Sequence, residues 1–280
     1  MKTAVLFGAG QMGAMISRLV GAEYSVLAFA DNFEKKWGTR LCNIPVISPA
    51  EAVAMNPDAV FICVLDDERS NAMAAQLISL GFTGEIISAA SLNIFDPRAA
   101  TMRLLAEQIN AHNIPGSIAE LGVYRGEFAS IISAAFPDRA FHLFDTFEGF
   151  KEADVKSERE NTFSKAAVND FSDTSVELVR SRMDQPERVI FHKGYFPDTF
   201  VGCEDERFAF VSIDADLYLP TAAALPIFWE RLSPGGVLML HDVLSTQFTG
   251  VSKAVDEFCS EKNILPMPVC DLHGSVVIRK

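Results

Sequence analysis

The 280-residue sequence lacks the features that mark membrane, secreted or nucleic-acid-binding proteins. It has no apolar run of the roughly 20 residues that a transmembrane helix needs. Its N-terminus leads directly into an apolar segment and a glycine turn, without a signal-peptide cleavage pattern, so we expect no membrane insertion and a cytoplasmic location. Only 24 Lys and Arg stand against 37 Asp and Glu, and this net charge of −13 disfavours binding to nucleic acid.

Cysteine is also scarce. The five cysteines are scattered, odd in number and without a Cys-x-x-Cys pair, which excludes a disulfide framework or a zinc finger and fits a reducing compartment. Apolar residues, by contrast, make up 49% of the chain and charged residues 22%. This composition is typical of a chain with a packed core and argues against disorder.

The first ninety residues alternate short apolar runs with helical patterns, which predicts a small parallel sheet covered by helices. A predicted strand at 3–7 is followed at once by the letters GAGQMG and then by a helical pattern. Here Gly8, Gly10 and Gly13 permit a tight turn and the approach of a phosphate to the helix N-terminus. Asp31, at the end of the next predicted strand, suits ribose hydroxyls. The alternative is that the glycines only form the turn, and that this region serves for docking or dimerisation.

This region resembles the small Rossmann-like domains at the front of bacterial polysaccharide-modifying proteins, including the sugar O-acetyltransferases. The resemblance rests on GAGQMG, on FADN at 29–32 and on the run from Gly38 to IPVISP at 44–49. It implies a nucleotide-binding type of domain that can hold a nucleotide-sugar. We predict that this domain spans residues 1–92 and that a second domain spans residues 93–280, with 93–114 as a linking helix.

A second strand–turn–helix pattern at 117–129 differs from the first in its charge. Glu120 ends the predicted strand, and Gly122 and Gly126 lie in the turn. A carboxylate at this position would repel a dinucleotide pyrophosphate but pairs with a cationic group. S-adenosylmethionine fits, because it carries an ammonium and a sulfonium.

The later strands agree with this cofactor. Asp145 ends the next predicted strand, where an acid suits ribose hydroxyls. Gly194 and Tyr195 follow a third strand, in the usual neighbourhood of an adenine. The C-terminal residues 267–279 predict a hairpin. The predicted fold is therefore a class I methyltransferase: a Rossmann-like α/β sheet of seven strands with the last one antiparallel, preceded by the smaller parallel α/β domain.

Acids also follow two further predicted strands. Asp214 and Asp216 come after the apolar run at 208–213, and His241 and Asp242 come after a glycine-led apolar run. Chemistry in open α/β sheets collects at the carboxyl ends of the strands, so we expect these side chains to meet at one rim. Unpaired buried charge is costly, and a bound divalent cation would explain the cluster.

Five blocks in this order are similar to the macrocin O-methyltransferase (TylF-like) family of S-adenosylmethionine-dependent sugar O-methyltransferases, across about residues 115–280. The blocks are ELGVYRG at 120–126, FDTFEGF at 144–150, GYFPDT at 194–199, IDADLY at 213–218 with PT at 220–221, and PGG at 234–236 with the acids after it.

The resemblance implies S-adenosylmethionine as cofactor, a sugar, glycosylated small molecule or polysaccharide precursor as acceptor, and a homodimer or higher homo-oligomer. The implied cofactor-binding residues are Glu120, Gly122, Tyr124, Arg125, Gly126, Asp145, Gly194, Tyr195 and Asp214. It assigns Asp216 as the catalytic base and Asp214, His241 and Asp242 as ligands of a divalent metal, Mg²⁺ or Mn²⁺.

His241 departs from the family, which has an acid there, and imidazole is a softer ligand than Mg²⁺ prefers. The departure leaves open a transition ion, an indirect role for His241, or a site without metal. Two functional alternatives also stay open: a catalytically degenerate nucleotide-sugar-binding or scaffold protein, and a small-molecule catechol-type O-methyltransferase. The polar, poorly periodic segment 148–175 predicts a mobile lid over the cofactor.

Overall fold

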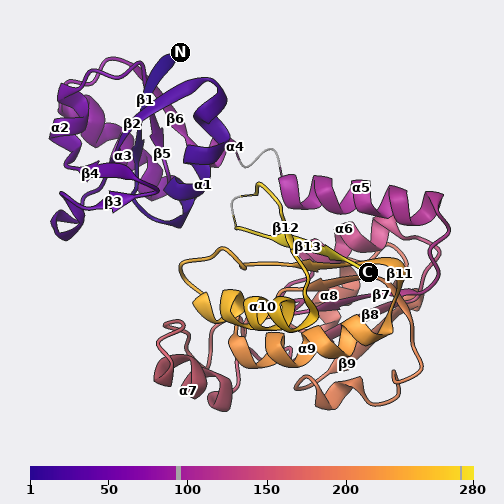
Figure 1. The fold of residues 1–280 in the computed structure, drawn as a ribbon. Helices are drawn as coiled ribbons and strands as arrows, with labels where there is room; N and C mark the ends of the chain where they lie inside the picture. Colours follow the sequence, from indigo (N-terminus) through magenta and orange to yellow (C-terminus); the bar gives the residue numbers. More distant parts are fainter. Residues whose placement is uncertain (93–95, 272) are drawn as a thin grey trace. The chain divides into compact units, whose positions relative to one another are not determined.

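The computed structural model describes residues 1–92, 96–271 and 273–280, which form two compact units (Figure 1). One unit comprises Met1–Asp96 with Cys270–His273, and the other comprises Pro97–Val269 with Gly274–Lys280. The predicted start of the linking helix falls on residues 93–95, which lie outside the described residues. Within the described part of the chain, no helix is long and apolar enough to cross a membrane.

The first unit is a six-stranded sheet with helices on both faces. Its strand order is β3-β4-β2-β1-β5-β6, and among the described residues only the β3–β4 pair is antiparallel. The strands are β1 (Lys2–Phe7), β2 (Tyr24–Ala30), β3 (Arg40–Leu41), β4 (Ile44–Ile47), β5 (Ala59–Ile62) and β6 (Glu85–Ser88). The helices are α1 (Gln11–Leu19), α2 (Pro49–Ala54), α3 (Asp67–Ser79) and α4 (Ala89–Leu92).

The core of the first unit follows from the alternation of side chains along β1. Leu6 belongs to a buried cluster with Ile16 of α1, whereas Phe7 belongs to a second cluster with Leu77 of α3. Both faces of the strand are therefore covered, which explains why its sequence is a continuous apolar run.

The second unit is a seven-stranded sheet in the order β12-β13-β11-β10-β7-β8-β9. Its strands are β7 (Ser117–Leu121), β8 (Phe141–Asp145), β9 (Val189–Lys193), β10 (Phe208–Ile213), β11 (Leu232–Leu240), β12 (Met267–Pro268) and β13 (Val276–Arg279). Its helices are α5 (Pro97–Ala111), α6 (Glu127–Ala135), α7 (Glu152–Glu160), α8 (Val176–Ser181), α9 (Tyr218–Arg231) and α10 (Thr249–Lys262). The last strand, β13, runs antiparallel to β11, and the predicted fold class is confirmed.

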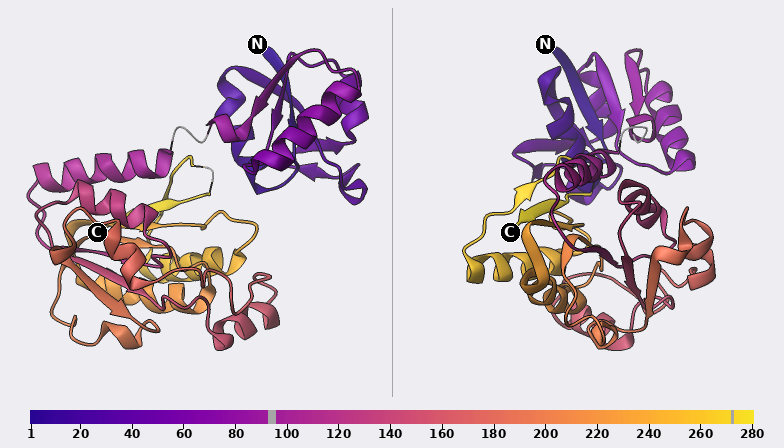
Figure 2. Two further views of the ribbon diagram at one scale, coloured as in Figure 1. Left: turned by 180° about the vertical axis from the view of Figure 1, so that it is seen from behind. Right: turned by 90° about the vertical axis from the view of Figure 1, so that its right-hand side faces the viewer.

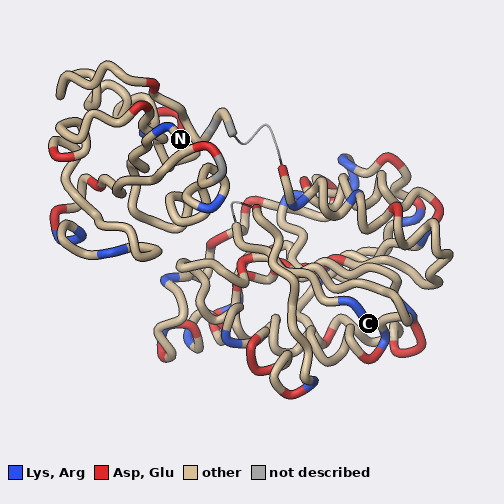
Figure 3. The backbone as a smooth tube through the Cα atoms, turned by 45° about the horizontal axis from the view of Figure 1, so that its top comes forward, with Lys and Arg blue, Asp and Glu red and all other residues tan. Residues whose placement is uncertain are grey.

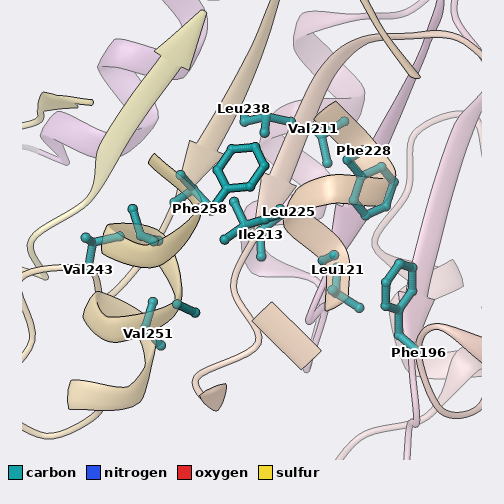
Figure 4. Packing of buried hydrophobic residues seen from close by; sticks show 14 of the residues in the cluster. Leu121, Phe196, Val211, Ile213, Leu225, Phe228, Leu238, Val243, Val251 and Phe258 are labelled. Atoms are coloured by element: carbon teal, nitrogen blue, oxygen red, sulfur yellow. The ribbon is translucent and has the colours of Figure 1, made fainter. Parts of the chain in front are cut away.

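Helices α5 and α6 cover one face of this sheet and α9 and α10 cover the other (Figure 2). Figure 4 shows Phe228 of α9 and Phe258 of α10 packed toward β10 and β11, where they meet Val211 and Leu238. Full burial of one such side chain stabilises the fold by about 1.5–3 kcal/mol. This packing holds β10 in place and thereby positions the residues that follow it.

The three central strands of the second unit end at the same level. Leu121 of β7, Ile213 of β10 and Leu240 of β11 lie in register. The pairing continues past the strand ends, since Asp214 N donates to Leu121 O at 2.8 Å and His241 N donates to Ile213 O at 2.9 Å. Residues from three strand ends are thereby fixed along one edge.

Candidate active site

An acidic rim, defined here as Asp214, Asp216, His241 and Asp242, lies at this edge. One carboxylate oxygen from each of the three Asp residues lies within 4.8 Å of the others. His241 Nδ1 lies 2.8 Å from Asp214 Oδ1 and 3.2 Å from Asp242 Oδ2. The structure thus places together the four residues that the sequence singles out after two different strands.

The backbone of the acidic rim is strained. Asp216 and Asp242 have φ values of 57° and 54°, in the left-handed region, and Tyr124 in the nearby glycine turn has a φ of 48°. For a non-glycine residue this conformation costs about 1–2 kcal/mol, although Asp tolerates it better than most. Strain of this kind concentrates at functional sites.

Sequence reasoning missed one member of the site, Arg98. This residue is the second in α5 and is 8% exposed. Its Nη1 lies 2.9 Å from Asp214 Oδ2, and its Nη2 donates to Ser212 Oγ at 3.4 Å. One feature of the sequence could have indicated Arg98: a cation in the first turn of a helix is unfavourable with respect to the helix dipole, so an arginine there suggests a partner elsewhere.

Burial and charge set the protonation of the acidic rim. Burial would raise the pKa of Asp214, but the positive charges of His241 and Arg98 outweigh burial and hold that pKa below its usual range. Burial likewise opposes the charge of His241, yet Asp214 raises the pKa of the imidazole to about 10. Burial, reinforced by Asp214 and Asp242, raises the pKa of Asp216 well above its ordinary value.

Glu120 lies buried beside the acidic rim, with 1% of its surface exposed. Burial raises its pKa, and the nearby Arg98 opposes that shift. Its Oε2 is buried and has no hydrogen-bond partner within residues 1–92, 96–271 and 273–280. A buried acceptor without a donor is costly. A ligand that brings an N–H group would satisfy it.

The glycine turn after β7 is sterically required. Gly122 has a φ of 83°, and a Cβ there would lie 1.9 Å from Asp214 O. Gly126 has a φ of 81° and precedes the first residue of α6. The turn therefore lies directly against the strand end that carries Asp214.

Asp145 connects this turn to the loop after β8. Its Oδ2 accepts from Val123 N at 2.7 Å and from Tyr124 N at 3.0 Å, and its Oδ1 accepts from Phe147 N at 2.6 Å. Gly194 N donates to Asp145 O at 2.9 Å. The carboxylate thus adjoins the turn and the loop after β9 but is already engaged with backbone amides.

The aromatic and basic residues of the predicted cofactor set bond to the segment 148–175. The Tyr124 hydroxyl donates to Asp173 at 2.7 Å, and Arg125 Nη1 lies 3.3 Å from the same carboxylate. The Tyr195 hydroxyl donates to Asp154 Oδ1 of α7 at 2.8 Å. The segment therefore contacts the turn and the loop after β9 through side chains.

The predicted nucleotide site of the first unit lies where β1 leads into α1. Gly8 and Gly10 lie in the turn between β1 and α1, and Gly13 lies in the first turn of α1, where a Cβ would be 2.2 Å from Gly8 O. Asp31 Oδ2 accepts from Ala9 N at 2.9 Å within that turn. The Asp31 carboxylate also pairs with Lys36 Nζ at 2.8 Å. The acid is thus next to the glycines, but its hydrogen bonds here serve the turn.

The protein-family model of macrocin-O-methyltransferase (TylF) matches residues 87–280. The chain belongs to this family. The match includes α5 and Arg98, and so begins before the block that first indicated the TylF family in the sequence.

Curated relatives agree with the TylF assignment. The 8-demethyl-8-(2,3-dimethoxy-alpha-L-rhamnosyl)-tetracenomycin-C 4'-O-methyltransferase of Streptomyces olivaceus is 31% identical over 157 residues, covering 52% of this chain and 59% of that protein. The mycinamicin III 3''-O-methyltransferase of Micromonospora griseorubida is 32% identical over 141 residues, covering 46% of this chain and 56% of that protein. The chain thus spans less than two thirds of these relatives.

Solved structures support the fold. The O-methyltransferase NovP has a TM-score of 0.53 and 24% identity, with 66% of this chain and 79% of that chain covered. CalS11, a calicheamicin methyltransferase, has a TM-score of 0.54 and 20% identity, with 65% and 77% covered. At these identities the likeness concerns the fold alone.

Proposed function

We propose that this TylF-family chain is an S-adenosylmethionine-dependent O-methyltransferase that methylates a hydroxyl of a sugar or glycosylated small molecule. The observation that carries the proposal is the acidic rim beside Glu120, whose buried Oε2 has no hydrogen-bond partner among the residues that the structure describes. The rim can accept a proton and orient a polyol, while Glu120 suits the ammonium of the cofactor. The printed names of both curated relatives, which concern a rhamnosyl-tetracenomycin and a mycinamicin, support a sugar as acceptor.

In this proposal the cofactor lies against the glycine turn after β7 and the loops after β8 and β9. The binding residues would be Glu120, Gly122, Tyr124, Arg125, Gly126, Asp145, Gly194, Tyr195 and Asp214. Methyl transfer is an in-line displacement, in which the sulfonium carbon–sulfur bond breaks as the new oxygen–carbon bond forms. The main task of the protein is therefore to align the hydroxyl oxygen with the methyl carbon.

Asp216 is the proposed base. The hydroxyl proton passes to its carboxylate as the oxygen attacks, and S-adenosylhomocysteine leaves as a neutral thioether. The raised pKa of Asp216 strengthens it as a proton acceptor once it is ionised. The position of Asp216 beside Asp214 and Asp242 supports this role. These two carboxylates follow the ends of β10 and β11, and their negative charges help to raise the pKa of Asp216.

Asp214, His241 and Asp242 fit a divalent cation. His241 Nδ1 lies 2.8 Å from Asp214 Oδ1 and 3.2 Å from Asp242 Oδ2, and carboxylate oxygens of Asp214 and Asp242 lie within 4.8 Å of one another, so these residues would be close enough to hold one ion. An imidazole among carboxylates favours Mn²⁺ or another transition ion over Mg²⁺. When bound, such an ion would polarise a sugar hydroxyl. His241 would have to release its proton to ligate.

For the predicted first domain, residues 1–92, we propose a nucleotide-binding role. The turn at Gly8 and Gly10, with Gly13 at the start of α1 and Asp31 beside the turn, supports this role. Titration with a UDP-sugar probes it independently of the methyltransferase unit, and absence of binding at millimolar concentration would contradict it.

Two measurements test the proposed reaction. Calorimetry with S-adenosylhomocysteine should show one binding site, and labelled S-adenosylmethionine should methylate rhamnosylated tetracenomycin or mycinamicin III but not catechol. Methylation of catechol alone would favour the catechol-type alternative. Absence of S-adenosylhomocysteine binding would contradict a methyltransferase and favour the degenerate binding protein.

A further inference from the structure

Arg98 lies outside all five sequence blocks of the methyltransferase and yet reaches its centre. The guanidinium comes from the first turn of α5 and contacts two residues of β10 and the strand end, Ser212 and Asp214. Its central carbon lies 3.8 Å from the ring centroid of Phe128, in the first turn of α6. The side chain therefore joins α5, α6 and the end of β10, and the aromatic ring fixes its plane.

The charges around Asp214 explain why a cation is needed there. Asp214, Asp216 and Asp242 lie within ligand distance of one another, and the buried Glu120 is electrostatically coupled to Asp214. Arg98 supplies a positive charge through its guanidinium group. The planar guanidinium fork also fixes the orientation of the Asp214 carboxylate, since separate N–H groups contact Asp214 and Ser212.

The two oxygens of Asp214 are held from different sides. Arg98 Nη1 contacts Oδ2, and His241 Nδ1 contacts Oδ1. Rotation of the carboxylate would break both contacts. Without Arg98, one side of the carboxylate would be released and would face the other acids of the rim.

We propose that Arg98 is a positioning residue for methyl transfer: it fixes the orientation of Asp214 and offsets the negative charge of the acidic rim. This inference rests on the proposed function. It predicts that the charge and fork of Arg98 matter more for turnover than for cofactor affinity, because Asp214 must be oriented when the acceptor oxygen attacks.

Arg139 provides a matched control. It is also a partly buried arginine beside an aromatic ring, 5.7 Å from the centroid of Phe136. Its Nη1 donates to the carbonyls of Ile114 and Gly116, at 2.8 and 2.7 Å, before the start of β7. It therefore stabilises the sheet at the amino ends of its parallel strands, whereas the acidic rim lies at their carboxyl ends.

The test compares Arg98→Met, Arg98→Lys and Arg139→Met in the full chain. We expect Arg98→Met to lower kcat at least about 100-fold while the S-adenosylhomocysteine Kd rises by less than about tenfold, because Asp214 is only one of the nine proposed cofactor-binding residues. Arg98→Lys should recover about a tenth of the wild-type kcat, because it restores the charge but not the fork. Arg139→Met should lower Tm but leave kcat within about twofold of wild type.

The possible outcomes separate the two proposals. A kcat of Arg98→Met within about threefold of wild type, or an equal loss of kcat in Arg139→Met, would overturn the positioning role alone. A wild type that methylates no probe would overturn the proposed function, and the role of Arg98 with it. If Arg98→Met does not fold, Arg98→Lys decides: a full wild-type kcat overturns the need for the fork.

Discussion

Asp216 is the residue on which the proposed chemistry depends most directly. We expect Asp216→Asn to lower kcat by about 10²–10⁴-fold, because the amide keeps the shape of the side chain but cannot take the hydroxyl proton. The S-adenosylhomocysteine Kd should change little. Steady-state kinetics with calorimetry measures both, and Asp256→Asn, an exposed acid of α10, is the control. Turnover at the wild-type rate would exclude Asp216 as the base.

His241 allows the proposed cation to be tested by removal and exchange. Chelation should lower turnover, and Mn²⁺ should restore it better than Mg²⁺, because the site mixes a nitrogen with carboxylate oxygens. His241→Asp should reverse that order by making the site all-oxygen. Mn²⁺ binding followed by electron paramagnetic resonance gives a readout besides activity. Turnover unaffected by chelation in both proteins would contradict a catalytic metal.

A pair of histidines outside the acidic rim predicts a pH dependence of stability. His142 Nδ1 and His192 Nε2 are 3.0 Å apart on β8 and β9, so only one proton fits between them. Burial, with the neighbouring His142, lowers the pKa of His192 to about 4. Because the unfolded chain then binds the proton more readily, this pair should lose stability as the pH falls from about 6.5 toward 4.

Urea unfolding at several pH values, with His192→Gln as the comparison, isolates this contribution. The wild type should lose more of its free energy of unfolding between pH 7 and pH 5 than the variant does, since glutamine does not titrate. Above pH 7 the difference between the two proteins should be constant. Parallel curves across the whole range would mean that the pair does not control acid stability.

The acidic rim could be predicted from the sequence because parallel strands bring their carboxyl ends to one edge, so acids after two apolar runs were expected to meet. Arg98 could not be predicted in this way. It acts across the sheet from a helix far along the chain, and its pairing with Asp214 depends on how α5 packs. A first-turn arginine indicates a local conflict with the helix dipole but does not identify the partner.

At the scale of single elements, the glycine turn after β7 gives a sharp prediction. In Gly122→Ala the new Cβ would lie 1.9 Å from Asp214 O, on a residue with a φ of 83°. We expect a loss of more than about 3 kcal/mol in the free energy of unfolding and loss of S-adenosylhomocysteine binding.

Gly202 is the matched control for this substitution. It has a φ of 91°, but a Cβ there meets no atom of the described residues within 4 Å. Gly202→Ala should therefore cost only the backbone penalty of about 1–2 kcal/mol and leave binding unchanged. Equal effects of the two substitutions in urea unfolding would show that close approach to Asp214 is unimportant.

The structure of the segment 148–175 could not be predicted from its sequence. Its polar composition predicts a mobile lid, yet α7 within it buries Asp154 and Glu158. Glu158 Oε1 accepts from Tyr218 N, at 2.8 Å, where α9 begins. An acid that binds a helix N-terminus is stabilised by the dipole, but sequence cannot distinguish such an acid from a solvated one. The apolar strands were predictable because burial on both faces leaves a continuous pattern.

At the scale of the molecule, each unit has its own sheet and its own buried clusters, and acidic and basic residues are interspersed along both (Figure 3). Both α/β patterns were predictable, because each starts with a strand, a glycine turn and a helix. Whether the two units unfold independently was not predictable, since no local sequence pattern encodes it. A substitution confined to the first unit tests this.

Gly13→Ala is such a substitution, because a Cβ on Gly13 would lie 2.2 Å from Gly8 O, at the start of α1. We expect it to lower the Tm of the first unit by several degrees, since α1 must shift away from β1. S-adenosylhomocysteine should still bind and should raise the Tm of the second unit alone, because a ligand stabilises only the unit that binds it.

Differential scanning calorimetry with and without S-adenosylhomocysteine resolves the two transitions. Gly21→Ala, where a Cβ meets no atom within 4 Å in the described part of the chain, should leave both unchanged. A single transition that moves as a whole, in Gly13→Ala and on adding ligand, would mean that the two units unfold as one. The first unit would then be a stabilising part of the methyltransferase, and loss of its glycine turn would be expected to weaken cofactor binding as well.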